Sequence, residues 1–156
     1  MNDNSAVIIA VFSARQESVE TINKSFRNAG VASHCLWAND SHALIDQLNR
    51  DPQLIIVEQS HANLAARDIA DIRSRVNPRL PVLFTSTKID QDILSDAFKL
   101  GANDVCSLND PDRLIAVADR ELRLYRAEHA LDATLDSATQ FKKHIKELMA
   151  DTPDAL

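Results

Sequence analysis

Short, uninterrupted apolar runs alternate along this chain with segments in which apolar residues recur at helical spacing, and this alternation restricts the possible folds more than any other feature. Five such runs occur: AVIIAVF (6–12), VASHCLWA (31–38), QLIIVE (53–58), PVLFTS (81–86) and NDVCSL (103–108). Consecutive apolar positions suit strands that are buried on both faces, as in a parallel sheet with helices on each side. The sequence therefore predicts an α/β fold with a doubly wound, five-stranded parallel sheet.

Start and stop signals delimit the helices that we expect between these strands. The predicted helix ends are Gly30, Asn77-Pro78 and Gly101. The predicted helix starts are Asp40 or Ser41 for the second helix, and Asp110 with Pro111 for the fifth. The apolar positions expected within the fourth helix are Ile89, Ile93, Ala97 and Leu100.

The fifth predicted helix is longer than such a domain needs, since residues 112–149 contain neither glycine nor proline. Apolar residues seven apart form a stripe along it: Val117, Leu124, Leu131, Ala138 and Ile145. Second positions are partly filled by Leu135, Phe141, Leu148 and Met149, and the stripe is interrupted by Glu121, Glu128 and Lys142. The spacing is typical of a two-stranded coiled coil or signalling helix, and the alternative is a long amphipathic helix packed on its own domain.

Composition excludes several classes of function. The net charge of −6 and the pI near 5.3 argue against binding to nucleic acid or to an anionic membrane surface. Two glycines in 156 residues exclude a glycine-rich phosphate loop. No run suggests a membrane span or signal peptide, and no Cys/His spacing suggests zinc, so we expect no cofactor. Cys35 and Cys106 lie in apolar runs and are expected to be buried, reduced thiols, which indicates the cytoplasm.

Three stretches resemble the receiver domain of bacterial response regulators, a CheY-like family. They are the third predicted strand with its flanking proline (52–58), the fourth strand (81–86), and Ala97-Phe98-Lys99-Leu100-Gly101-Ala102-Asn103-Asp104, which is similar to the family's A-F-x-x-G-A-x-D passage. The resemblance covers residues 6–125. It implies a (βα)5 flavodoxin-like fold with an extended C-terminal helix and a role in two-component phosphorelay signalling.

The resemblance also implies a phosphorylation site at the carboxyl ends of the strands. The family uses two carboxylates that hold Mg²⁺, an aspartate nucleophile, a Ser or Thr, and a Lys. In this sequence the corresponding positions are Phe12 and Ser13 (metal), Glu58 (phosphoacceptor), Ser86 (Ser/Thr), Leu108 (Lys), with Val105 at the aromatic switch position. Only the serine is retained, so the site is degenerate. We expect no catalytic or metal residue and no phosphorylation.

Glu58 itself has two interpretations, a fixed charge that imitates a phosphorylated aspartate or a solvated carboxylate paired with Arg15 or Lys88. Ser13 and Gln16 are expected to form a helix capping box, and Trp37 to pack in the core or at the sheet edge. The alternative function is an atypical, active phosphoreceiver that takes a phosphoryl group from a histidine kinase, with Asp104 or Glu17 compensating in the metal site. A third possibility is a different small ligand at the same site.

The expected organisation is a receiver domain (1–125), a helical extension (126–150) and a linker or the start of a following domain (151–156). The ending Thr152-Pro153-Asp154-Ala155-Leu156 is similar to the beginning of PAS domains. Together these parts resemble the FimX-like layout, receiver–PAS–GGDEF–EAL, of cyclic-di-GMP signalling proteins. The implied partners are a second copy of the chain and downstream domains. The implied dimer surface is Asp96, Lys99, Asp104, Arg113, Val117, Arg120, Leu124, Leu131, Ala138 and Ile145.

Overall fold

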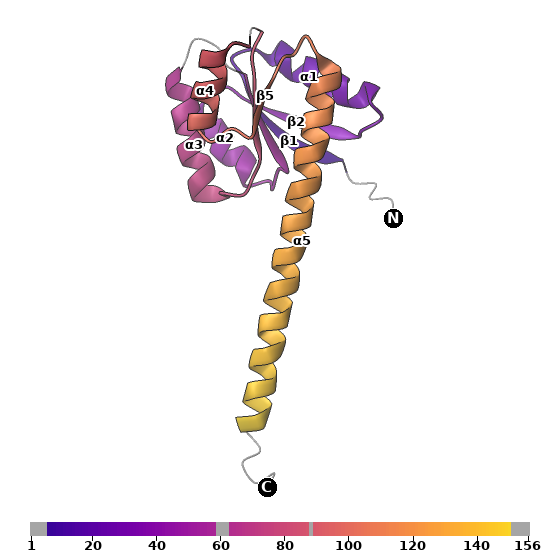
Figure 1. The fold of residues 1–156 in the computed structure, drawn as a ribbon, viewed down its shortest axis with the longest axis vertical. Coiled ribbons are helices and arrows are strands. Elements are labelled where there is room, and N and C mark those ends of the chain that lie inside the picture. The colour runs from indigo at the N-terminus through magenta and orange to yellow at the C-terminus, as the bar shows by residue number, and fades with distance from the viewer. Residues whose placement is uncertain (1–5, 59–62, 88, 151–156) are drawn as a thin grey trace. The chain divides into compact units, whose positions relative to one another are not determined.

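A computed structural model describes residues 6–58, 63–87 and 89–150 of the chain (Figure 1). Five parallel strands form one sheet in the order β2-β1-β3-β4-β5. Their bounds are β1 (Val7–Phe12), β2 (Ser33–Ala38), β3 (Leu54–Glu58), β4 (Val82–Thr85) and β5 (Asp104–Cys106). The predicted doubly wound, flavodoxin-like fold is confirmed.

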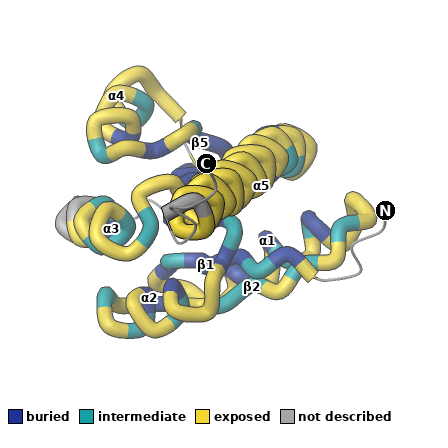
Figure 2. The backbone as a smooth tube through the Cα atoms, turned by 90° about the horizontal axis from the view of Figure 1, so that it is seen from below, coloured by how far each residue is buried: buried dark blue, intermediate teal, exposed yellow. Residues whose placement is uncertain are grey.

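One helix follows each strand, as predicted. The helices are α1 (Gln16–Asn28), α2 (Ser41–Leu48), α3 (Asn63–Val76), α4 (Gln91–Lys99) and α5 (Pro111–Ala150). In Figure 2, α2, α3 and α4 lie on one side of the sheet, and α1 with the first turns of α5 on the other. The long final helix is therefore present without a break from Pro111 onward.

Aspartate side chains begin three of these helices by accepting a hydrogen bond from a backbone N–H of the first turn. Asp40 caps α2 at 2.7 Å, and Asp90 caps α4 at 2.9 Å. Asp110 accepts from the third residue of α5 at 3.2 Å, which confirms the predicted Asp-Pro start. The cap at Asp90 places Ile89 before α4, so the expectation that Ile89 belongs to this helix was wrong.

Two glycines end helices because they adopt a positive φ that other residues avoid. Gly30 follows α1 with φ 80°, and Gly101 follows α4 with φ 88°. At both places the backbone reverses toward the next strand. The two predicted stop signals are confirmed.

The hydrophobic core on the α1 side contains the first turns of α5. Val117 is only 5% exposed and packs in one cluster with Leu114, Ala118 and Leu122 and with residues of α1 and the sheet. This burial contradicts the assignment of Val117 to a dimer surface. The heptad spacing does not distinguish a residue that faces its own domain from one that faces a partner, because both require an apolar side chain.

The cysteines differ in their surroundings. Cys106 on β5 is fully buried, as predicted, whereas Cys35 on the edge strand β2 is only partly buried. Both are free thiols, and burial raises the pKa of each to about 11. Neither thiol is therefore ionised to a reactive thiolate near neutral pH.

The chain divides into two compact units, Met1–Leu122 and Arg123–Leu156, and the division falls within α5. Within the described ranges, no helix is both long and apolar enough to cross a membrane. The described part of the second unit is entirely helical. Because a single helix has no second element to pack against, the described side chains of this unit do not form a hydrophobic core like that of the first unit.

Ile56→Ala removes a fully buried side chain from the central strand β3. We expect the free energy of unfolding to fall by about 2–5 kcal/mol because a cavity replaces packed atoms. Ile45→Ala on α2, where the isoleucine is 40% exposed, is the matched control and should change stability by only about 0.5 kcal/mol. Urea denaturation of the two variants measures the difference, and equal losses would contradict the assignment of this core.

Candidate functional site

The candidate site lies where the first, third and fourth strands end. The parallel register pairs Phe12 of β1 with Val57 of β3, and Glu58 of β3 with Thr85 of β4. Carboxyl ends of parallel strands meet at one edge of the sheet, which is where such folds carry their ligands. The structure thus brings Ser13, directly after β1, beside Glu58.

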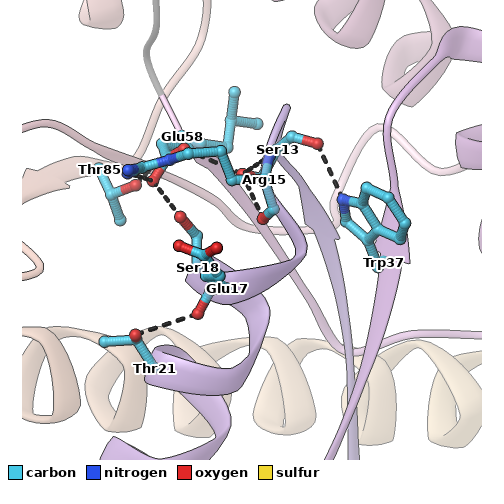
Figure 3. A network of polar contacts seen from close by, with 9 residues as sticks. Ser13, Arg15, Glu17, Ser18, Thr21, Trp37, Glu58 and Thr85 are labelled. Atoms are coloured by element: carbon cyan, nitrogen blue, oxygen red, sulfur yellow. Dashed lines mark hydrogen bonds and ion pairs between the residues drawn. The ribbon is translucent and has the colours of Figure 1, made fainter.

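Three side chains of the β1–α1 region bind the carboxylate of Glu58 (Figure 3). Ser13 Oγ donates to Oε1 at 2.9 Å, Ser18 Oγ donates to Oε2 at 2.5 Å, and Arg15 Nη2 donates to Oε2 at 3.2 Å. The Glu58 side chain is only 8% exposed. The predicted pairing with Arg15 is confirmed, but Glu58 is not a solvated carboxylate, because protein donors replace most of its water. Lys88, the other predicted partner, lies outside the described residues.

The loop after β1 directs these donors. Ser13 Oγ accepts a hydrogen bond from the backbone N–H of Arg15 at 3.0 Å. The carbonyl oxygen of Ser13 accepts one from Trp37 Nε1 at 2.9 Å. Trp37 itself is 36% exposed on the edge strand β2, so it packs at the edge and not in the core. These bonds hold the loop in a conformation that presents Ser13 to Glu58.

The expected capping box between Ser13 and Gln16 was wrong. Arg15 occupies the N-cap of α1, and no side chain caps this helix. The Ser13 hydroxyl instead contacts Glu58 and the backbone of Arg15. Ser18, in the first turn of α1 and 3% exposed, was not identified from the sequence at all. A serine in a helix carries no local signal that it binds a carboxylate forty residues away.

The electrostatics of the site favour an ionised Glu58. Burial alone would raise the pKa of this carboxyl, but hydrogen bonds from Ser18, Arg15 and Ser13, together with the positive charge of Arg15, lower it below its usual value. In turn, the hydrogen bond and charge of Glu58 raise the pKa of Arg15. The pair therefore remains charged throughout the neutral range.

The remaining family positions are apolar or engaged elsewhere. Leu108 is partly buried and packs against the core on the α1 side, and Val105 is fully buried. The backbone N–H of Ser86 donates to the Cys106 carbonyl at 3.0 Å, and Ser86 is 8% exposed. A leucine has no polar atom to bind a phosphoryl oxygen.

The residues present do not fit the Mg²⁺ ion that receivers use. Mg²⁺ requires oxygen ligands and usually carboxylates, but its expected position holds Phe12 and Ser13, and the guanidinium of Arg15 binds Glu58 there. Among the residues that the structure describes, no group of three His, Cys, Asp or Glu side chains is arranged to hold a metal.

Asp104 lies at the first residue of β5, the opposite end of the strands from Glu58. It forms ion pairs with Arg113 at 3.2 Å and with Arg120 at 3.3 Å, and Arg120 also contacts Glu121 at 3.2 Å. Asp104 therefore cannot compensate in a metal site near Glu58, which contradicts that part of the alternative. Three residues of the predicted dimer surface, Asp104, Arg113 and Arg120, therefore form ion pairs within the chain. Two others, Asp96 and Lys99 on α4, are exposed.

No protein-family model matches the sequence, and no curated protein matches it. Solved structures do match the fold. The signal receiver domain of a protein described as a LuxO repressor, from Vibrio parahaemolyticus, has a TM-score of 0.68 at 15% identity over 81% of this chain and 98% of that one. The chain has the receiver fold. At such low identity the match extends to the fold and to nothing finer.

Two further solved structures are similar to this chain, a receiver domain and a fusion protein that contains a coiled coil. The beryllofluoride-activated receiver domain of DrrB has a TM-score of 0.60 at 15% identity, covering 76% of this chain and 99% of that one. A fusion of a trimeric coiled-coil segment of yeast Spc42 to another protein has a TM-score of 0.66 at 14% identity, covering 96% of this chain and 99% of that one.

Glu58→Gln removes the charge that Arg15 and the two serines bind. We expect the free energy of unfolding at pH 7 to fall by about 1–3 kcal/mol while the fold is retained. Because the pKa of Glu58 is lowered in the folded state, its stabilisation is present above the unfolded pKa of about 4.3 and is lost as pH falls through the folded value. The difference between the two proteins should therefore shrink in acid.

Chemical denaturation at a series of pH values measures this difference. Glu20→Gln, at an exposed position on α1, is the matched control and should leave both stability and its pH dependence nearly unchanged. If the Glu58→Gln protein were as stable as the wild type at pH 7, the contacts of Ser13, Arg15 and Ser18 with the charged carboxylate would contribute nothing to stability.

Proposed function

We propose that this chain is a non-enzymatic signalling module, a receiver-fold domain that does not accept a phosphoryl group and acts through association. One observation carries the proposal: the carboxylate at the phosphoacceptor position is already bound by Ser13, Arg15 and Ser18. The chain itself supplies the positive charge that a metal ion provides in phosphorylatable receivers.

Phosphoryl transfer depends on positioning and on neutralising the charge of the transferred group. Glu58 is one methylene longer than aspartate, and a displacement of about 1 Å at a reacting atom can cost on the order of a hundredfold in rate. Ser13 donates to the carboxylate where the family supplies a metal ligand. Leu108 replaces the lysine. Each change opposes transfer: a metal carboxylate and the lysine are absent, and the remaining carboxylate is displaced and already bound.

The same contacts support a permanently held state of the domain. In the proposed role, Glu58 with Arg15 fixes the β1–α1 loop against β3 without any phosphorylation cycle. The output then passes through residues 126–150 to a following domain that begins near residue 151, within a cytoplasmic FimX-like, receiver–PAS–GGDEF–EAL protein of cyclic-di-GMP signalling. The similarity of the chain's ending to the beginning of PAS domains supports this arrangement.

An amide NMR titration with Mg²⁺ and then beryllofluoride tests the proposal. We expect no saturable shift at Glu58, Ser86 or their neighbours, because Arg15 binds the carboxylate and the described residues hold no group of three His, Cys, Asp or Glu side chains arranged for a metal. The DrrB receiver domain, which binds beryllofluoride in its solved structure, is the positive control.

A variant of the same chain provides an internal control. Ser13→Asp combined with Arg15→Ala replaces a donor and a cation by a carboxylate, so Mg²⁺ should shift amides near residue 58 in this variant alone. Saturable shifts in the wild-type chain would overturn the proposal and favour the alternative, an atypical phosphoreceiver.

A further inference from the structure

The second unit exposes large apolar side chains along one helix. Leu124 is 53% exposed, Leu131 58%, Phe141 66%, Ile145 39% and Leu148 50%. Exposed (yellow) positions dominate this part of α5 in Figure 2. A helix outside a folded core gains most of its stability from packing an apolar face against another element. Within the described part of the chain, these side chains remain largely uncovered.

These residues belong to a regular seam with alternating steps of three and four. The seam consists of Leu124, Ala127, Leu131, Thr134, Ala138, Phe141, Ile145 and Leu148. No member carries a charge. Glu128 and Lys142 lie one residue after Ala127 and Phe141, on the flank of the seam, so they do not interrupt it as the sevenfold stripe alone suggested. Alternating steps of three and four residues are the pattern of a two-stranded coiled coil.

The seam begins where the globular unit ends. Leu122, the last residue of the first unit, is 4% exposed and belongs to its core. Leu124, two residues later, is exposed and opens the seam. The apolar stripe predicted from the sequence therefore has two parts, and Val117 belongs to the domain core.

We propose that residues 124–148 pair with a second copy of this chain as a parallel, in-register, two-stranded coiled coil. The interface is this seam and not the globular face around Asp104, whose carboxylate already binds Arg113 and Arg120. The parallel orientation rests on the proposed function, because only then do both globular units adjoin the same end of the coil.

The flanking charges are compatible with this pairing. In a parallel coil, the residue just before Leu124, Leu131, Ala138 or Ile145 faces the partner residue five places further along. Arg123 then faces the oppositely charged Glu128 of the second copy, while Ala130 faces Leu135 and Ser137 faces Lys142. No like charges meet across the seam flanks, so electrostatics does not oppose association of two identical chains.

Two alanines allow a matched test of the seam. Ala138 lies in it, whereas Ala133 lies on the opposite side of the same helix, and both are exposed. The same change, Ala138→Asp or Ala133→Asp, has the same intrinsic effect on the helix but buries a charge only in the first case. We expect Ala138→Asp to raise the dimer dissociation constant on the order of a hundredfold or more, and Ala133→Asp to leave it nearly unchanged.

Sedimentation equilibrium on the full chain measures the dissociation constants, and circular dichroism verifies that both variants are folded. A monomeric wild-type chain, a mass of three copies, or equal effects of the two substitutions would overturn the proposal. These readouts are independent of the Mg²⁺ titration. A monomer that binds neither Mg²⁺ nor beryllofluoride would overturn only the coiled coil. A dimer that binds both would overturn only the proposed function.

Cysteine crosslinking tests the orientation. In a parallel coil the two copies of residue 131 face each other, so Leu131→Cys should form a disulfide-linked dimer under mild oxidation. Ala133→Cys, in the same background with the native Cys35 and Cys106, is the control and should not. A dimer in which Leu131→Cys fails to crosslink would overturn the parallel arrangement.

Discussion

The burial of strand β3 is the constraint on which the rest of the structure depends. Leu54 to Val57 are all 0–3% exposed at the centre of the sheet, and a shift of one residue would exchange the faces of every side chain. The residue after them must therefore emerge at the carboxyl edge. Because that residue is a glutamate with little access to water, the neighbouring loop must supply its hydrogen bonds. Ser13, Arg15 and Ser18 do so, and they thereby connect β3 to the start of α1.

Charges are neutralised within the chain at both ends of the strands. Glu58 binds Arg15 at the carboxyl end, and Asp104 binds Arg113 and Arg120 at the amino end. At the carboxyl end, the cation beside the carboxylate is therefore a side chain of the same chain, Arg15.

The final helix performs two different tasks along its length. Its first turns complete the core through Leu114, Val117, Ala118 and Leu122. Beyond Leu122, its apolar side chains are exposed and follow coiled-coil spacing. The signalling by association that we propose needs no chemistry at the sheet edge, so it is consistent with a carboxylate that is neutralised within the chain and with an exposed helical seam.

The sequence by itself determined the order of strands and helices along the chain, a helix start at Asp40 or Ser41, the start at Asp110, and the stops at Gly30 and Gly101. These signals are local, since they depend on the preferences of a few adjacent residues. Only the tertiary structure decided that Ser13 and Ser18 bind Glu58, and that Val117 faces the core. Those facts depend on which faces meet after folding, either between residues forty or more positions apart or on a helix whose apolar stripe lies in two environments. The pattern of neighbouring residues in the sequence therefore predicts neither the contacts of Glu58 nor the burial of Val117.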